Sequence, residues 1–296
     1  MSARVITTVE EFREACDEVR ASGGVLGLVP TMGALHEGHL ALVREAKSRA
    51  TVVALTLFVN PTQFGPGEDL DKYPRQLEQD VQLASSAGAS LVFAPTVAEM
   101  YPAGESTRVT VKGVTEHLCG ASRPGHFDGV ATIVTKLFIV AGPCVAVFGR
   151  KDYQQVKVIE RMVQDLLLPV GIVGHPTVRE PDGLALSSRN RFLSPEERAR
   201  ALAIPAGLAK ASALFDAGVR EVKPLREAVV SSLQGASLEI LYVAVTDPDT
   251  LQPLEDSASV EGRALIALAA RCGATRLIDN VVLGEEPAPS VTARHG

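Results

Sequence analysis

The sequence predicts an α/β protein, in which helices cover a parallel sheet and a smaller α+β domain follows. Between residues 25 and 173, short apolar strand-like segments alternate with segments that repeat apolar residues at helical spacing. After about residue 176, two helices are followed by three strands. The chain has 296 residues, 46% of them hydrophobic, which is enough for two cores. We predict domains at 1–176 and 177–284 and a disordered tail at 285–296.

The strands and helices of the first domain are expected to alternate along the chain. A continuous apolar run at 51–59 is typical of a strand buried on both faces of a parallel sheet. The helix at 152–168 has the clearest pattern, with Leu166 and Leu167 on its apolar face. The predicted strands are 25–29, 51–59, 90–94, 144–148 and 170–173, and the predicted helices are 39–50, 76–87, 128–141 and 152–168. Ligands of such sheets lie beyond the C-terminal ends of the strands.

The second domain is expected to contain fewer elements, in a different order. Its predicted helices are 195–214 and 221–234, and its predicted strands are 239–246, 264–270 and 275–283. Helices followed by strands in this way indicate an α+β arrangement.

Composition excludes several classes of protein. The net charge of −6 gives no general basis for nucleic-acid binding. The longest apolar stretch, 137–149, is interrupted by Gly142 and Pro143 and is shorter than the about 20 residues of a membrane-spanning helix. The N-terminus has acidic residues where a signal peptide is apolar, and the four cysteines form no CxxC pair. We therefore expect free thiols, a cytoplasmic location and no membrane partner.

The first candidate site is PTMGALHEGH at 30–39, between a predicted strand and a predicted helix. A helix N-terminus offers unpaired backbone N–H groups to phosphate, and His36 and His39 add imidazole donors. Gly33 and Gly38 allow close approach of a ligand to the backbone. The histidines are three residues apart with a glycine between them, which does not fit the zinc-protease pattern. A purely structural alternative is that both histidines only cap the helix.

Four further segments follow strands or precede helices. FVNPTQF at 58–64 supplies the neutral amides Asn60 and Gln63, which suit a hydroxy acid, although Asn-Pro is also a common turn. The others are RPGHFDG at 123–129, GRKDYQQ at 149–155 and LSSRNR at 186–191, which combine basic residues with glycine or serine. Each could be an ordinary surface loop or helix cap. Neither a P-loop nor a dinucleotide fingerprint is present, so bound phosphate would be held by several loops.

Taken together, these segments resemble the pantoate–β-alanine ligase family. PTMGALHEGH, FVNPTQF, YPR at 73–75, RPGHFDGV, GRKDYQQ and DGLALSSRNR occur in order, and LIDN at 277–280 also fits. The resemblance implies a Rossmann-like nucleotidyltransferase domain with a smaller C-terminal α+β lid domain. It also implies a homodimer. Cys119 stands where the family more usually has Glu, and Arg150 where it has Glu or Lys.

The resemblance implies a reaction in two steps with Mg²⁺ and ATP. The pantoate carboxylate attacks the α-phosphorus and releases pyrophosphate, and β-alanine then displaces AMP from pantoyl adenylate to give pantothenate. A lid would protect this intermediate from water. His39 corresponds to the family's catalytic acid; since a carboxylate nucleophile has no proton to lose, hydrogen bonding to phosphate is the simpler role.

The resemblance also assigns residues. The expected catalytic residues are His36, His39, Lys151 and Arg189. The expected ATP contacts are Met32, Gly33, Ala34, Leu35, His36, Glu37, Gly38, His39, Gly149, Arg150, Lys151, Asp152, Val178, Leu186, Ser187, Ser188 and Arg189. The expected contacts of pantoate and β-alanine are Pro30, Met32, Asn60, Gln63, His126 and Gln155. Asp80 lies near a family acidic pair associated with Mg²⁺, although Gln79 precedes it.

Two other functions share part of this pattern. A nucleotidyltransferase acting on a phosphorylated precursor would also carry the histidine motif, but it would not need the neutral Asn60, Gln63 and Gln155. A non-enzymatic nucleotide-binding protein would tolerate loss of His36, His39, Lys151 or Arg189, all of which are present. Release of AMP separates the ligase from both alternatives.

Overall fold

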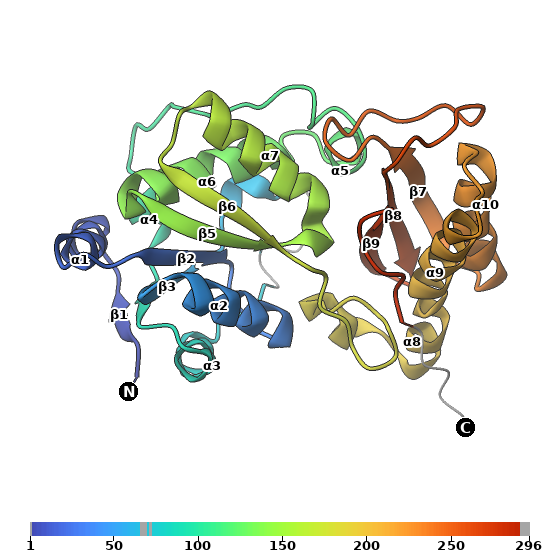
Figure 1. Ribbon diagram of the computed structural model, residues 1–296. Coiled ribbons are helices and arrows are strands. Elements are labelled where there is room, and N and C mark those ends of the chain that lie inside the picture. Colours follow the sequence, from blue (N-terminus) through green and yellow to red (C-terminus); the bar gives the residue numbers. More distant parts are fainter. Residues whose placement is uncertain (1, 66–69, 71–72, 291–296) are drawn as a thin grey trace. The chain divides into compact units, whose positions relative to one another are not determined.

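The computed structural model describes residues 2–65, 70 and 73–290 (Figure 1). The chain forms two compact units. The first comprises Met1–Lys112, Arg123–Arg150 and Gln155–Pro176; the second comprises Gly113–Ser122, Lys151–Gln154 and Thr177–Gly296. Residues 291–296 of the expected tail lie outside the described part of the chain.

The first unit is built on a six-stranded parallel sheet with the order β1-β4-β3-β2-β5-β6. Its strands are β1 (Arg4–Ile6), β2 (Leu26–Thr31), β3 (Val52–Leu57), β4 (Leu91–Phe93), β5 (Cys144–Gly149) and β6 (Val170–His175). The four central strands carry the apolar runs that predicted them, and Leu28, Val53, Val92 and Ala146 are fully buried. Together with the small antiparallel sheet of the second unit, this confirms the predicted fold class.

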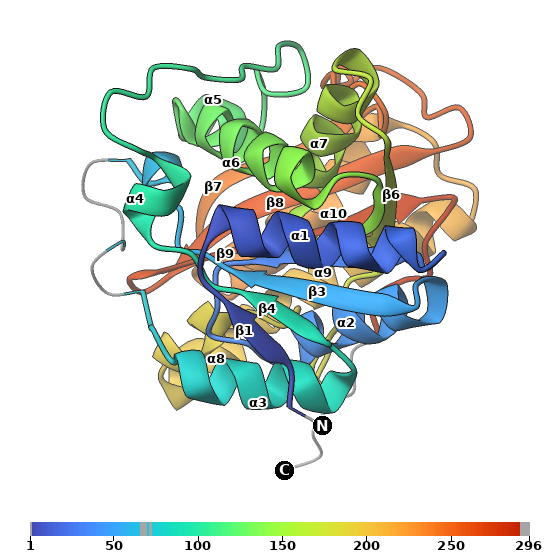
Figure 2. The same cartoon turned by 90° about the vertical axis from the view of Figure 1, so that its left-hand side faces the viewer.

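Helices cover both faces of this sheet. Figure 2 shows α1 and α6 on one face and α2 and α3 on the other. The bounds of the helices in this unit are α1 (Val9–Ala21), α2 (Glu37–Arg49), η1 (Pro61–Gln63), α3 (Leu77–Ala87), α4 (Val97–Met100), α6 (His126–Ala141) and α7 (Tyr153–Asp165), of which α7 begins two residues inside the second unit. At the end of α3, Gly88 adopts a φ of +111°, which lets the chain turn towards β4.

The strand order creates a switch point beside β2. The connection through α2 leads from β2 to β3 on one side, whereas β5 pairs with the opposite edge of β2. The loops after β2 and β5 therefore diverge at the C-terminal end of the sheet, where α/β sheets bind ligands. The histidine motif follows β2, and Asn60 lies three residues beyond β3.

The second unit contains the antiparallel sheet β7-β8-β9, with strands at Glu239–Thr246, Ala264–Cys272 and Thr275–Leu283. Its helices are α5 (Cys119–Ser122), α8 (Pro195–Ala201), α9 (Ala203–Asp216) and α10 (Val222–Gly235). Short 3₁₀ turns occur at η3 (Ser188–Phe192) and at η2 (Arg150–Asp152), whose first residue belongs to the first unit. Leu208 of α9, Leu225 of α10 and Ile266 of β8 are among the residues that form its apolar core.

Two predicted helices are corrected by the structure. The helix expected at 195–214 is interrupted at Leu202, because Pro205 lacks an N–H group and its ring would clash with the carbonyl of Ala201 in a continuous helix. The helix expected to reach residue 168 ends at Asp165. Leu167 adopts a φ of +54° and is 87% exposed, so the expected burial of Leu166 and Leu167 was wrong. Pro169 disfavours a helical conformation at Leu168.

Two N-terminal elements were not predicted. β1 is only three residues long and pairs with β4, which is distant in sequence. α1 buries Phe12, Ala15, Cys16 and Val19 at helical spacing, but its many acidic residues concealed this pattern. Among the helices that the structure describes, none is long and apolar enough to cross a membrane.

Candidate active site

The two motif histidines lie at the start of α2. His36 is the N-cap residue, and the rings of His36 and His39 stack with their centroids 4.1 Å apart. The backbone N–H of His36 donates to Nδ1 of His39 over 3.4 Å. Because Nδ1 accepts this bond, Nε2 of a neutral His39 ring carries the proton and is a hydrogen-bond donor. The purely structural alternative thus accounts for Nδ1 of His39.

A buried carboxylate shapes the loop that leads into α2. Asp80 of α3 is 3% exposed, and its Oδ2 and Oδ1 accept the backbone N–H groups of Ala34 and Leu35 over 2.9 and 2.8 Å. Gly33 and Ala34 have φ values of +89° and +52°. A Cβ atom on Gly33 would lie 2.9 Å from the Asp80 carboxylate, so glycine is required there.

This carboxylate bears on the expected magnesium site. Among residues 2–65, 70 and 73–290, no group of three or more His, Cys, Asp or Glu residues could hold a metal ion. Both oxygens of Asp80 serve the backbone of the loop, which is a structural role. Magnesium ligation by Asp80 stays a prediction.

Replacing Asp80 by Asn should destabilise the first unit. The amide has only one acceptor oxygen, so one backbone N–H in the loop would face an NH₂ group instead. The expected loss in free energy of unfolding is about 1–3 kcal/mol, measured by denaturant titration. Glu78→Gln, on the exposed face of the same helix, is the matched control and should change the free energy of unfolding little. Equal stability of Asp80→Asn and the native chain would contradict the structural role of the Asp80 carboxylate.

Asn60 and Gln63 form a directional pair of amides. Asn60 is 1% exposed, and its Nδ2 donates to Oε1 of Gln63 at 3.1 Å and to the carbonyl of Gly129 at 3.0 Å. Its Oδ1 accepts from the Tyr101 hydroxyl at 2.7 Å. Since the Gly129 carbonyl can only accept, the orientation of both amides is determined. Gln63 therefore turns Nε2 away from Asn60 and towards the Met32 sulfur, which lies 3.1 Å away.

The tyrosine keeps this pair in one orientation. Burial raises the pKa of Tyr101, and a hydrogen bond with Thr62 offsets only part of this effect. The phenol therefore stays protonated near neutral pH and acts as the donor to Asn60. Sequence reasoning missed Tyr101, because a single tyrosine 41 positions away carries no local signal.

The backbone of Gln63 is also held in place. Nδ1 of His126 lies 2.8 Å from the Gln63 carbonyl, and Arg123 lies 2.9 Å from the other ring nitrogen of His126. Because a carbonyl accepts, Nδ1 of His126 is the donor. Asn60 and His126, both expected to bind substrate, thus hold Gln63 from two sides.

Gly129 permits the close packing of η1 on α6. A Cβ atom there would lie 2.4 Å from the Thr62 carbonyl oxygen and 2.6 Å from the Gln63 nitrogen. Gly129→Ala should therefore displace η1 and lower the free energy of unfolding by about 1–3 kcal/mol. Gly171→Ala is the control, because a Cβ atom at that position meets nothing within 4 Å. Similar unfolding free energies for the two variants would contradict this prediction.

The second unit contributes a further group of predicted residues. Nζ of Lys151 lies 3.4 Å from Asp152, and the Lys151 carbonyl accepts from Nδ2 of buried Asn280 over 2.8 Å. Ser187 caps η3 by accepting the N–H of Arg189. Asn280, the last residue of LIDN, thus fixes the backbone of Lys151.

The predicted site residues are divided between the units. The first unit contains Pro30, Met32, Gly33, Ala34, Leu35, His36, Glu37, Gly38, His39, Asn60, Gln63, Asp80, His126, Gly149, Arg150 and Gln155. The second contains Lys151, Asp152, Val178, Leu186, Ser187, Ser188 and Arg189.

Cys119 lies in a polar cluster of the second unit. Its sulfur is 3.1 Å from the Tyr242 hydroxyl and 3.2 Å from Nη2 of Arg276, and its N–H donates to Gln154. All four cysteines are free thiols, as the sequence predicted. Cys119 stands where Glu is more usual in the family, and its thiol accepts a hydrogen bond from Arg276.

Comparison with known proteins identifies the family. A family model described as pantoate-beta-alanine ligase matches residues 4–282. This chain belongs to the pantoate–β-alanine ligase family. The pantothenate synthetase of Moorella thermoacetica is 54% identical over 280 residues, covering 94% of this chain and 98% of the relative. That of Myxococcus xanthus is 54% identical over 287 residues, covering 97% and 98%.

Solved structures of ligases in this family share the fold. Pantothenate synthetase from Thermus thermophilus has a TM-score of 0.87 and 47% identity, covering 94% of this chain and 98% of its own. The ligase from Francisella tularensis, complexed with beta-gamma ATP and β-alanine, has a TM-score of 0.78 and 33% identity, covering 98% and 100%. The predicted family, fold and ligase class are confirmed.

Proposed function

We propose that this ligase condenses pantoate with β-alanine at the expense of ATP, through pantoyl adenylate, and releases AMP and pyrophosphate. The observation that carries the proposal is the fixed pair of amides, Asn60 and Gln63, in the same unit as the histidine motif. Neutral amides suit a hydroxy acid, and the motif at a helix N-terminus suits phosphate. The family match over residues 4–282 supports the same chemistry.

In the first step, a carboxylate oxygen of pantoate bonds to the α-phosphorus, and the bond from this phosphorus to the β-phosphate bridging oxygen breaks. Gln63 and Gln155 hold pantoate, with Pro30 and Met32 beside it. The N-terminus of α2, with His36 and His39, donates hydrogen bonds to the phosphates. Lys151 and Arg189 neutralise the charge of the departing pyrophosphate. No proton is transferred in this step.

In the second step, the amine of β-alanine bonds to the acyl carbon, AMP leaves, and the nitrogen loses a proton. The acyl adenylate hydrolyses if water reaches it, so the site must exclude water. We propose residues 1–176 as the catalytic domain and residues 177–284 as the lid. Mg²⁺ enters as the MgATP complex, held mainly by the phosphates. A homodimer in the cytoplasm completes the proposal.

The proposal is tested by exchange of labelled pyrophosphate into ATP, with pantoate and Mg²⁺ present and β-alanine withheld. Exchange that requires pantoate is expected, because adenylation is then reversible. Addition of β-alanine should yield AMP and pantothenate. No pantothenate with all three substrates would overturn the proposal. Pyrophosphate release without AMP would instead indicate a nucleotidyltransferase acting on another acceptor, and release of neither product a non-enzymatic nucleotide-binding protein.

A further inference from the structure

The segment that contains Ser187, Ser188 and Arg189 begins at a small hairpin of the second unit. The backbone N–H of Leu186 donates to the Val178 carbonyl over 2.9 Å, and Glu180 donates to Leu184 over 2.8 Å. Gly183, with a φ of +93°, forms the tip. The hairpin thus holds the N-terminal end of the segment.

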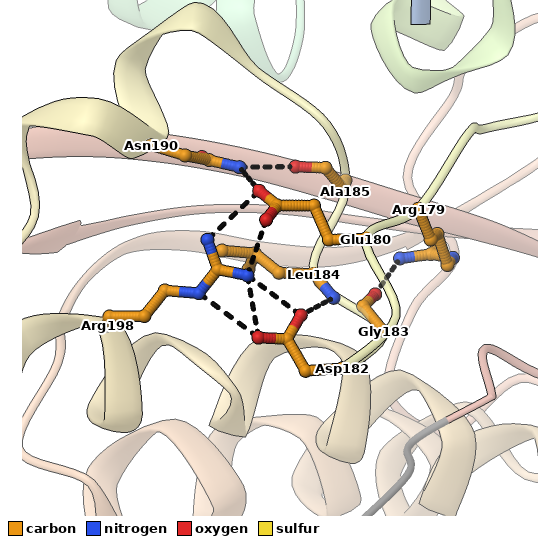
Figure 3. A network of polar contacts seen from close by, with 8 residues as sticks. All are labelled: Arg179, Glu180, Asp182, Gly183, Leu184, Ala185, Asn190 and Arg198. Carbon is orange, nitrogen blue, oxygen red and sulfur yellow. Dashed lines mark hydrogen bonds and ion pairs between the residues drawn. The ribbon is translucent and has the colours of Figure 1, made fainter. Parts of the chain in front are cut away.

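One guanidinium group joins two carboxylates of this hairpin. Arg198 of α8 donates from Nη1 and Nη2 to Glu180 over 2.9 and 2.8 Å, and from Nη2 to Asp182 over 2.6 Å (Figure 3). Asp182 is 5% exposed, and a buried carboxylate that loses its cationic partner destabilises the fold strongly. Burial raises the pKa of Glu180, but hydrogen bonds from Arg198 and Asn190 outweigh burial and lower it.

The side-chain amide of Asn190 fixes the C-terminal end of the segment that contains Ser187, Ser188 and Arg189. Nδ2 of Asn190 donates to Glu180 over 2.7 Å and to the Ala185 carbonyl over 3.0 Å (Figure 3). Ala185 precedes the segment by two residues and Asn190 follows it by one. The four residues between them, 186–189, are therefore enclosed in a loop that the Asn190 amide closes, and the same amide joins this loop to Glu180.

The hairpin is fixed in turn to the sheet of its own unit. Arg179 forms two hydrogen bonds of 2.7 and 3.0 Å with Asp279 of β9, which is 2% exposed. It also donates to the Gly183 carbonyl at the tip. Such two-point arginine–carboxylate bonds restrict orientation as well as distance.

We propose that Arg198 is a positioning residue, which acts through Glu180 and Asn190 to hold Ser187, Ser188 and Arg189 ready for the β- and γ-phosphates of ATP. The inference rests on the proposed function, because it takes ATP as the ligand of this segment. Lysine cannot replace Arg198, since an ammonium group lacks the planar arrangement of donors that two carboxylates share here.

The test compares Arg198→Lys with Arg226→Lys in the full chain. Arg226 makes a similar two-point bond to Asp256 in the same unit, at 3.0 and 2.8 Å, and is the matched control. Binding of ATP and of AMP is measured by calorimetric titration. Arg198→Lys should weaken ATP binding at least about tenfold and leave AMP binding within about twofold, because AMP lacks the phosphates in question. Arg226→Lys should change neither.

A second variant covers the case in which Arg198→Lys does not fold. Asn190→Ala removes one amide and keeps both ion pairs, and it should show the same selective loss for ATP. Equal weakening of ATP and AMP, or no weakening of ATP, in the folded variant would overturn the inference. Failure of the proposed function is recognised separately, because the native protein would then make no pantothenate, whatever the two affinities are.

Discussion

Replacing His39 by Ala should lower the rate of adenylate formation by about 10²–10³-fold, the usual effect of removing one preorganised donor from a developing charge. Nδ1 of His39 accepts the His36 N–H group, so Nε2 is the donor that is lost. The rate is measured by pantoate-dependent pyrophosphate exchange. Circular dichroism should show a folded protein, because the bond that Nδ1 of His39 accepts at the start of α2 is a long one, at 3.4 Å.

His39→Gln separates hydrogen bonding from proton transfer. The glutamine amide reaches about as far as Nε2 and donates a hydrogen bond, but it does not titrate. Retention of part of the activity by His39→Gln, with a loss for His39→Ala, supports donation to phosphate. Equal losses in both variants would favour proton transfer. His117→Ala, at a histidine of the second unit that contacts Gln252, is the control and should retain full activity.

Lys151→Ala should produce the second large effect, again about 10²–10³-fold in adenylate formation. An ammonium group that neutralises pyrophosphate has most effect as the leaving group gains charge, so kcat should fall more than the KM for ATP rises. Pantoate-dependent exchange at varied ATP separates the two parameters. The backbone of Lys151 is held by Asn280 and should not move.

Lys157→Ala is the matched control for this variant. Both lysine side chains are 18% exposed and both pair with a carboxylate, Asp152 for Lys151 and Glu160 for Lys157. A normal rate for Lys151→Ala would remove Lys151 from the mechanism. A similar fall in rate for both variants would show that the loss of any positive charge, and not of Lys151 in particular, slows adenylate formation.

The central strands and the histidine loop could be predicted because their signals are local. An uninterrupted apolar run of strand length indicates a buried parallel strand, and two histidines accompanied by glycines between a strand and a helix indicate a phosphate site. The break at Leu202 was also encoded locally, in Pro205, but it was overlooked within a long helical pattern.

The contacts that shape the site could not be predicted in this way. Asp80 bonds the backbone 45 and 46 positions earlier, and Asn60 meets the Gly129 carbonyl 69 positions later. Neither pairing leaves a pattern in sequence, because each depends on how α3 and α6 pack on the sheet. The residues of the motifs were therefore found, whereas Tyr101 and the contacts by which Asp80 and Asn60 orient the site were not.

The fixed amide of Gln63 has a consequence for inhibitor design. Its orientation is imposed from the Gly129 carbonyl through Asn60, so rotating the Gln63 amide would place its NH₂ group against the NH₂ group of Asn60. A compound that offers a hydroxyl, sulfonyl or carboxylate oxygen to Nε2 replaces the weak contact with the Met32 sulfur by a stronger one. An isosteric compound with an N–H group at that point meets a second donor. Such a pair of compounds should differ in affinity in favour of the oxygen-bearing member.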